Sequence, residues 1–207
     1  TGNFGDVYAG YLAKKLGLPI NKLIVATNQN DILHRAISKG SYQAEKVSET
    51  ISPSMDIQIA SNFERLIFDL NNEDDIQTSK DMKNIKEIGN YTLDNKKLNR
   101  INENFLSVRM SEKETLEIIS SVYKKFNVVL DPHTAIGYGA FDKHNLSGNN
   151  IVLGTAHPSK FPDAIFRAIK ANADLPSELM FILNEKENYD IIENDVEKLK
   201  QHIKDRL

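Results

Sequence analysis

The sequence contains no cysteine, which excludes disulfide bonds and thiolate chemistry. It has no apolar run near the ~20 residues that a membrane-spanning helix needs. Its net charge of -3 lacks the basic excess that favours nucleic acid or an anionic membrane surface, so we expect neither partner. The absence of cysteine and of a basic and then apolar opening stretch fits the reducing cytoplasm, the compartment that we expect.

The composition is that of an ordinary globular protein. Hydrophobic residues make up 40% and charged residues 27% of the 207 positions, which argues against intrinsic disorder. This length allows one sizeable domain with a real core, or two small ones.

Apolar periodicity in the first forty residues alternates between helix and strand. Residues 6–16 carry Tyr8, Leu12 and Leu16 on one helical face, and a glycine and a proline follow as stop signals. Residues 23–27 predict a short buried strand, and a polar turn then leads into a helix that ends near Gly40. This rhythm is typical of an α/β fold in which flanking helices cover a parallel sheet.

The remainder of the chain continues the pattern after a polar interruption. Residues 62–70 predict a helix, and the polar stretch around 71–100 is interpreted as a solvated insertion. Ser111 and Glu114 form a capping box. The helix that follows should bury Leu116, Ile119, Tyr123 and Phe126. We expect further strands at 105–108, 128–130 and 151–153, and helices at 132–141, started by Asp131 and Pro132, and 193–207.

Two glycines precede the first predicted helix, in the stretch Thr-Gly-Asn-Phe-Gly-Asp at residues 1–6. Glycine lets the backbone turn tightly, so that successive amides converge on one point in front of the helix. The unpaired amides and dipole of the helix favour a phosphate there. A loop and helix cap without a ligand is the alternative reading. A nucleotide-binding P-loop is disfavoured because no Gly-Lys-Ser/Thr follows, and a dinucleotide fingerprint lacks its third glycine.

A second candidate lies where the predicted strand 151–153 ends, in Gly-Thr-Ala-His-Pro at residues 154–158. Ligands of open parallel sheets gather beyond the carboxyl ends of the strands, so Thr155 is placed to present its hydroxyl to a site. Taken alone, this threonine reads more simply as an ordinary hydrogen bond at a strand end.

Several segments, in one order, resemble those of threonine synthase, an enzyme of the tryptophan-synthase-β-like fold, which is fold type II among pyridoxal-phosphate enzymes. The opening loop continues into Ala-Gly-Tyr-Leu-Ala-Lys-Lys-Leu-Gly-Leu-Pro-Ile. The other matching segments are Ala-Thr-Asn at 26–28, Ser-Pro-Ser-Met-Asp at 52–56, Asn-Phe-Glu-Arg at 62–65, Asp-Pro-His-Thr-Ala at 131–135 and Gly-Thr-Ala-His-Pro at 154–158. The resemblance extends from the first residue to about residue 163 and is only loose beyond it.

The resemblance implies the cofactor, the reaction and the residues of the site. Pyridoxal 5'-phosphate would serve an enzyme that converts O-phosphohomoserine and water into threonine and phosphate. A hydroxyl at the pyridine nitrogen stabilises a protonated ring less than a carboxylate does, which should favour elimination and replacement over transamination. The residues implied around the cofactor phosphate are Gly2, Asn3, Phe4, Gly5 and Asp6, and the one implied at the pyridine nitrogen is Thr155.

The chain departs from the family at the residue that attaches the cofactor. The Schiff-base lysine of threonine synthase follows a phenylalanine, and no Phe-Lys pair occurs here. We therefore expect residues 1–207 to be the C-terminal part of the cofactor-binding domain, with the N-terminal half absent and no catalytic residue present. Three interpretations stay open: a piece of a functional enzyme whose partner is the missing half, a non-catalytic remnant, and a generic phosphate-binding module.

The histidines do not suggest a catalytic or metal site. The five in the chain lack a metal-binding spacing such as His-Glu-x-x-His, so no metal is expected. His133 follows a helix-starting proline and is interpreted as a core or helix-end residue, and His157 as a cap of its own helix.

Overall fold

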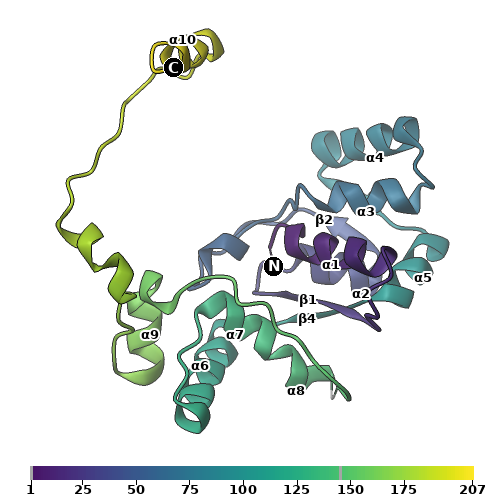
Figure 1. Ribbon diagram of the computed structural model, residues 1–207. Coiled ribbons are helices and arrows are strands. Elements are labelled where there is room, and N and C mark those ends of the chain that lie inside the picture. The colour runs from purple at the N-terminus through teal and green to yellow at the C-terminus, as the bar shows by residue number, and fades with distance from the viewer. Residues whose placement is uncertain (1, 145) are drawn as a thin grey trace. The chain divides into compact units, whose positions relative to one another are not determined.

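The computed structural model describes residues 2–144 and 146–207, and Thr1 of the predicted loop therefore lies outside the described residues (Figure 1). Residues 1–173 form one compact unit and residues 174–207 a second. None of the helices in the described part of the chain is long and apolar enough to cross a membrane.

Two parallel strands lie at the centre of the first unit. They are β1 (Leu23–Thr27) and β4 (Phe105–Arg109), paired in register from Leu23 opposite Phe105 to Thr27 opposite Arg109. Both strands were predicted, and their parallel pairing confirms the expected α/β class. Figure 1 shows α1 on one side of this pair and α6, α7 and α8 on the other. The carboxyl ends of both strands meet at one edge, where a ligand site of this fold class is expected.

Alternation along the strands divides the core into two clusters. Val25 and Phe105 belong to the first, and Ala26 and Val108 to the second, because successive side chains of a strand point to opposite faces. The first cluster lies under α1 (Gly5–Lys15), α2 (Ile32–Lys39) and α3 (Phe63–Leu70). The second lies under α6 (Glu112–Phe126), α7 (Pro132–Tyr138), α8 (Ala140–His144) and α9 (Pro162–Ile169).

The predicted helix boundaries are confirmed at several caps. Gly40 ends α2 in the left-handed conformation, with φ 71°. Ser111 and Glu114 form the reciprocal capping box of α6, and Asp131 caps α7, whose first residue is Pro132.

The buried faces of two helices differ from the predicted ones. On α6 the buried residues are Thr115, Ile118, Ile119 and Val122. Of the predicted set, Ile119 is buried but Phe126 is 53% exposed, so the buried stripe is rotated by about one position. On α1, Val7 is buried while Leu16 of the predicted face is 81% exposed. Periodicity alone finds a helix but does not decide which of two overlapping apolar stripes meets a neighbour.

Two predicted strands are wrong. Residues 128–130 and 151–153 are irregular in the structure, and Ile151 is 88% exposed. A strand needs a hydrogen-bonded neighbour, and within the described residues neither stretch pairs with another. Three consecutive apolar residues are therefore too weak a signal without a partner.

The stretch around 71–100 is more ordered than a solvated insertion. It forms α4 (Asp75–Ile88), β3 (Asn90–Thr92) and most of α5 (Asn95–Asn104). β3 pairs antiparallel with β2 (Ser41–Gln43), and Ile85, Tyr91 and Leu93 join the first core cluster. Most charged residues of this stretch are exposed, whereas Asp81 is buried with the packed side of α4.

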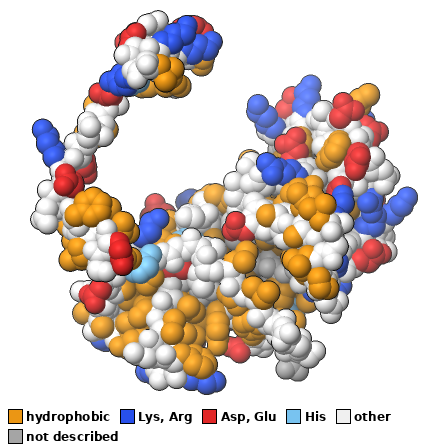
Figure 2. All heavy atoms as spheres, viewed as in Figure 1, with side chains coloured by type: hydrophobic (Ala, Val, Ile, Leu, Met, Phe, Trp, Pro, Cys, Tyr) orange, Lys and Arg blue, Asp and Glu red, His pale blue; other side chains and the backbone are white. Residues whose placement is uncertain are grey.

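The second unit consists of short, largely exposed elements. They are the 3-10 stretch η3 (Ser177–Asn184) and α10 (Val196–Lys204). Figure 2 shows apolar side chains on the former and mixed charged and apolar ones on the latter. Asp195 caps α10, and the predicted amphipathic C-terminal helix is therefore confirmed with a later start.

The capping box predicts an acid sensitivity of the first unit. Hydrogen bonds from Lys143 and Ser111 lower the pKa of the Glu114 carboxyl from 4.5 to about 2. A depressed folded-state pKa adds stability above pH 4.5 that is lost as the pH falls toward about 2. Glu114→Gln should therefore flatten the pH dependence of unfolding below pH 4.5, measured by urea titration. Glu117→Gln, on the exposed face of α6, is the control, and equal slopes for both variants would contradict this account.

Candidate functional site

Gly2 is packed so closely that a side chain has no room there. A Cβ at this position would lie 2.7 Å from the Met55 Cα and 2.9 Å from the Ser54 carbonyl oxygen. Both neighbours are backbone atoms and do not move aside easily. The glycine loop therefore lies directly against the short helix η1 (Pro53–Met55), which forms its back wall.

Phe4 anchors the loop from the core side. Its side chain is fully buried, edge-on to Phe63 at 5.3 Å and tilted toward Phe105 at 5.9 Å between ring centroids. Its backbone is left-handed, with φ 63°, a conformation that is strained for a bulky residue. The ring thus contributes to the core and is covered on all sides. The cofactor contact of Phe4 stays a prediction, and only its backbone could make it.

The amides behind this turn are unpaired in the described part of the chain. Phe4 occupies the N-cap of α1 and provides no side-chain cap, and the first amide of this region with a backbone acceptor is that of Tyr8. The amides of Gly5, Asp6 and Val7 consequently donate no hydrogen bond among the described residues. Unpaired amides at the positive end of a helix dipole are the groups that bind an anion.

Two further loop residues have defined positions. The side-chain oxygen of Asn3 accepts hydrogen bonds from the backbone amide of Ser61 at 2.7 Å and from its hydroxyl at 2.9 Å. Asn3 therefore ties the loop to the chain ahead of α3. Asp6 is exposed in the first turn of α1, where a carboxylate interacts favourably with the helix dipole.

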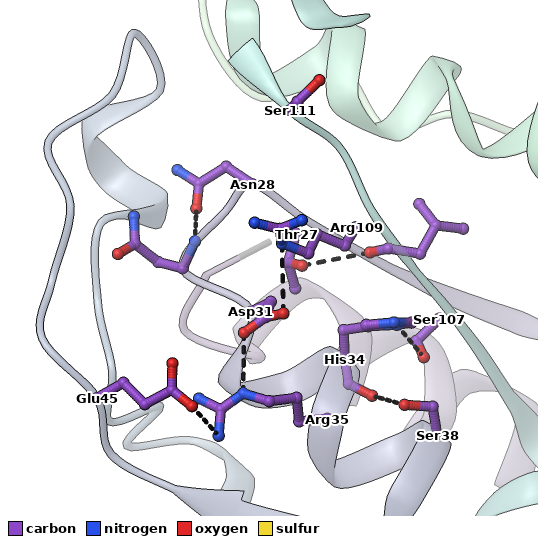
Figure 3. Close-up of polar contacts among 12 residues, drawn as sticks. Thr27, Asn28, Asp31, His34, Arg35, Ser38, Glu45, Ser107, Arg109 and Ser111 are labelled. Atoms are coloured by element: carbon purple, nitrogen blue, oxygen red, sulfur yellow. Dashed lines mark hydrogen bonds and ion pairs between the residues drawn. The ribbon is translucent and has the colours of Figure 1, made fainter.

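A buried polar network holds the back wall of the loop. The side-chain amide of Asn28, just beyond β1, donates to the Ser52 hydroxyl at 2.9 Å and to the Asp56 carboxylate at 2.7 Å. Asp56 also accepts from the Thr50 amide at 2.7 Å. Figure 3 shows Asn28 at the end of its strand, pointing away from the sheet toward this turn. The end of β1 thus fixes the turn against which Gly2 packs.

The second candidate region connects to the same wall. The amide of Ser54 donates to Nε2 of the buried His133 at 3.3 Å, and Nδ1 of His133 contacts the Asp131 carboxylate at 3.0 Å. The backbone amide of Thr155 donates to the Thr134 hydroxyl at 3.1 Å. Residues 131–134 therefore contact both the wall behind Gly2 and the Thr155 segment. Thr155 as a residue is exposed, and its hydroxyl oxygen lies 3.4 Å from that of Thr134.

Sequence reasoning missed a charged group at the same edge of the sheet. Arg109 is the last residue of β4, and its Nε lies 3.3 Å from Oδ2 of Asp31, whose Oδ1 accepts from Nε of Arg35 at 2.9 Å. Figure 3 shows the Arg109 guanidinium over Thr27, on the same side as Asn28. The position of Arg109 at the end of a predicted strand could have indicated this group. Its ion pair with Asp31 could not be predicted, because the two residues lie far apart in sequence.

The histidine expectations can be compared directly with the structure. His133 is buried, which confirms a core residue, and His157 accepts from the amide of Ser159 as the cap of η2 (Pro158–Lys160). Among residues 2–144 and 146–207, no group of three or more histidine or acidic side chains is arranged to hold a metal ion.

A cleft of about 560 Å³ lies beside the loop, between α1, α3 and α4. It is lined by Tyr8, Ser61, Asn62 and Arg65 among others, and Ser61 is the partner of Asn3. The described residues that line it do not include the predicted site residues, so we keep this cleft separate from the candidate site.

The contacts of Gly2 predict that one added methyl group destabilises the fold. Gly2→Ala should lower the free energy of unfolding by about 1–3 kcal/mol, because the new Cβ must displace the backbone at positions 54 and 55. Gly154→Ala is the matched control, since a Cβ there meets no atom within 4 Å. Urea denaturation measures both variants, and equal stability would contradict the packing described for the loop.

Removal of the Phe4 ring should also lower the free energy of unfolding. Phe4→Ala should cost about 3–5 kcal/mol of stability, as expected for removal of a buried aromatic ring. Phe126→Ala, at an exposed position of α6, should cost far less. The same denaturation measurement applies, and a small effect at Phe4 would show that its ring does not anchor the loop.

Comparison with known proteins gives one consistent result. The family described as threonine synthase, C-terminal, matches residues 134–203. The threonine synthase of Pseudomonas aeruginosa is 40% identical over 206 residues, and that of Saccharomyces cerevisiae is 39% identical over 234. Among solved structures, the PLP-bound threonine synthase of Brucella melitensis has a TM-score of 0.89 at 42% identity, and the yeast enzyme one of 0.84 at 39%.

The matches cover nearly all of this chain but less than half of each relative. The Pseudomonas and Brucella comparisons cover 98% and 99% of the chain but 44% of each relative. The yeast sequence is covered to 46%. The chain therefore spans less than half the length of the relatives that it matches.

Proposed function

Because the chain corresponds to the C-terminal portion of threonine synthase, we propose that it supplies one side of a pyridoxal 5'-phosphate site in that enzyme. The glycine loop holds the cofactor phosphate through backbone amides, and Thr155 contacts the pyridine nitrogen. The observation that carries this proposal is the set of amides at Gly5, Asp6 and Val7 that have no partner among the described residues, in front of a wall that excludes a side chain at Gly2.

The residues present fit a phosphate ester with an aromatic ring. Amides at a helix start suit the dianion, and the hydroxyl of the exposed Thr155 suits a ring nitrogen. The solved structure of the Brucella enzyme is PLP-bound, which supports the choice of cofactor. Residues 131–134 contact both the wall of the loop and the Thr155 segment, which supports assigning both contacts to one site.

When bound, this cofactor supplies an electron sink for carbanion chemistry at amino acids. The chain's own residues bind and orient it. The loop fixes the anionic end by hydrogen bonds that carry no side-chain charge, and Thr155 offers a neutral hydroxyl at the other end. A neutral partner favours an unprotonated ring, which moderates the withdrawal of electrons.

The complete reaction belongs to a longer polypeptide than the part matched here. In the proposed enzyme, O-phosphohomoserine and water give threonine and phosphate, in a carbon–oxygen lyase reaction. The Schiff-base lysine, most substrate contacts and the cover over the site come from the other portion of the protein. Residues 1–207 alone bind the cofactor without a covalent bond and do not turn over substrate.

The absence of the Phe-Lys pair from this chain predicts the outcome of a trapping experiment. Incubation of the 207-residue chain with pyridoxal 5'-phosphate should change the absorbance of the cofactor saturably. Borohydride reduction should then leave no specific lysine adduct in mass spectrometry. A single stoichiometric modified lysine would contradict the division of roles between the two portions.

Complementation separates a working piece from a remnant. Mixing the chain with the N-terminal portion of a threonine synthase should restore phosphate release from O-phosphohomoserine if the chain is a piece of a functional enzyme. Gly2→Ala, whose Cβ would clash with the backbone, should reduce the restored rate more than Gly154→Ala, whose Cβ meets no atom within 4 Å. No release, with both portions folded and associated, would favour the non-catalytic reading.

A further inference from the structure

Four residues form a hydrogen-bonded series from the wall of the loop to Thr155, and the last link is the backbone amide of Thr155. They are His133, Asp131, Thr134 and Thr155, and the first three are buried. The resemblance assigned no role to Asp131 or Thr134. The chemistry of the four residues decides which group donates and which accepts in each of these hydrogen bonds.

Asp131 lies at the centre and accepts every hydrogen bond that it makes here. Its Oδ1 accepts from the backbone amide of His133 at 2.9 Å and from that of Thr134 at 3.3 Å. Its Oδ2 accepts from the Thr134 hydroxyl. Burial raises the pKa of Asp131, but the hydrogen bonds from His133 and Thr134 outweigh burial and hold the pKa below its ordinary value. A carboxylate is an acceptor alone, so the hydrogen of Thr134 points to Asp131.

The hydrogen-bond partners of His133 also decide which of its ring nitrogens carries the hydrogen. The Ser54 amide can act as a donor alone, so Nε2 of His133 accepts from it and carries no hydrogen. Nδ1 then carries the ring hydrogen and donates it to Asp131 at 3.0 Å. Asp131 thereby holds the wall behind Gly2 through His133, and the Thr155 segment through Thr134.

Thr134 has no hydrogen left to give to Thr155. It accepts the Thr155 backbone amide at 3.1 Å, which fixes the position of that residue. The two hydroxyl oxygens lie 3.4 Å apart, a long contact in which Thr155 is the donor because the hydrogen of Thr134 is on Asp131. The hydroxyl hydrogen of Thr155 can therefore turn to a closer acceptor.

We propose that Asp131 and Thr134 are positioning residues for the pyridine nitrogen of the cofactor. The Asp131 carboxylate takes the hydrogen of Thr134, Thr134 holds the amide of Thr155, and Thr155 keeps its own hydrogen to donate to an unprotonated ring nitrogen. This inference rests on the proposed function, because it needs the cofactor ring at Thr155. The unloaded chain nevertheless tests the contact between Thr134 and the amide of Thr155.

The first experiment measures amide hydrogen exchange at Thr155 by NMR in the chain without cofactor. Thr134→Val removes the acceptor and should speed exchange about fivefold to tenfold, the loss of one hydrogen bond. Thr134→Ser keeps a hydroxyl and should restore the wild-type rate. Thr78→Val is the matched control, since Thr78 is also buried and its hydroxyl both donates, to Asp74, and accepts, from Asn71.

The wild-type chain provides a measurement that does not depend on the folding of a variant. Its Thr155 amide should exchange more slowly than that of Gly154, which has no hydrogen bond among the described residues. Equal rates for the two amides would overturn the proposal without any substitution.

The second experiment uses pyridoxal 5'-phosphate labelled with nitrogen-15 in the ring. Bound to wild type or to Thr134→Ser, the ring nitrogen should keep the chemical shift of an unprotonated, hydrogen-bonded pyridine across neutral pH. With Thr134→Val it should titrate, because Thr155 is no longer held in place. The phosphorus-31 signal should stay that of bound cofactor in all three proteins.

The outcomes separate this proposal from the proposed function. If wild type does not bind the cofactor, the proposed function fails, while the exchange experiment still decides whether Thr134 holds the amide of Thr155. If wild type binds it and Thr134→Val matches wild type in both exchange and ring titration, the positioning proposal fails and the proposed function stands.

Discussion

The buried carboxylate of Asp131 is the point on which the geometry of the candidate site depends. It is 1% exposed and is reached by hydrogen bonds from His133 and Thr134 alone among the residues that the structure describes. A buried charge is stable when hydrogen bonds satisfy it, and the same bonds fix the groups that donate them. One residue thereby controls two distant pieces of chain, the wall behind Gly2 and the segment of Thr155.

The glycine loop is held by a different kind of force. Aromatic packing of Phe4 in the first core cluster offsets the strain of its left-handed backbone, and the packing of Gly2 against η1 sets how deep the turn lies. Hydrophobic burial on one side thus leaves amides unpaired on the other. An anion site of this type needs no charged side chain, which explains why a basic residue is not part of the predicted loop.

Features of the fold and of the candidate site could be predicted where they depend on residues that are close in sequence. The helix behind the glycine loop, the caps at Ser111 and Asp131, and the strands β1 and β4 follow from local sequence patterns and are confirmed. The binding role of the loop itself stays a prediction. The buried face of α6 was misread, because it depends on the neighbours of that helix. The network around Asp56 and the contact of Ser54 with His133 join residues far apart in sequence, so no local pattern reveals them.

The central claim is that the amides of the glycine turn bind the phosphate of pyridoxal 5'-phosphate. Phosphorus-31 NMR of the cofactor, titrated with pH in the presence of the chain, tests this claim most directly. The account predicts a bound dianion whose chemical shift does not change across the pH range in which the free phosphate protonates. A signal that follows the titration curve of the free cofactor at saturating protein would contradict it.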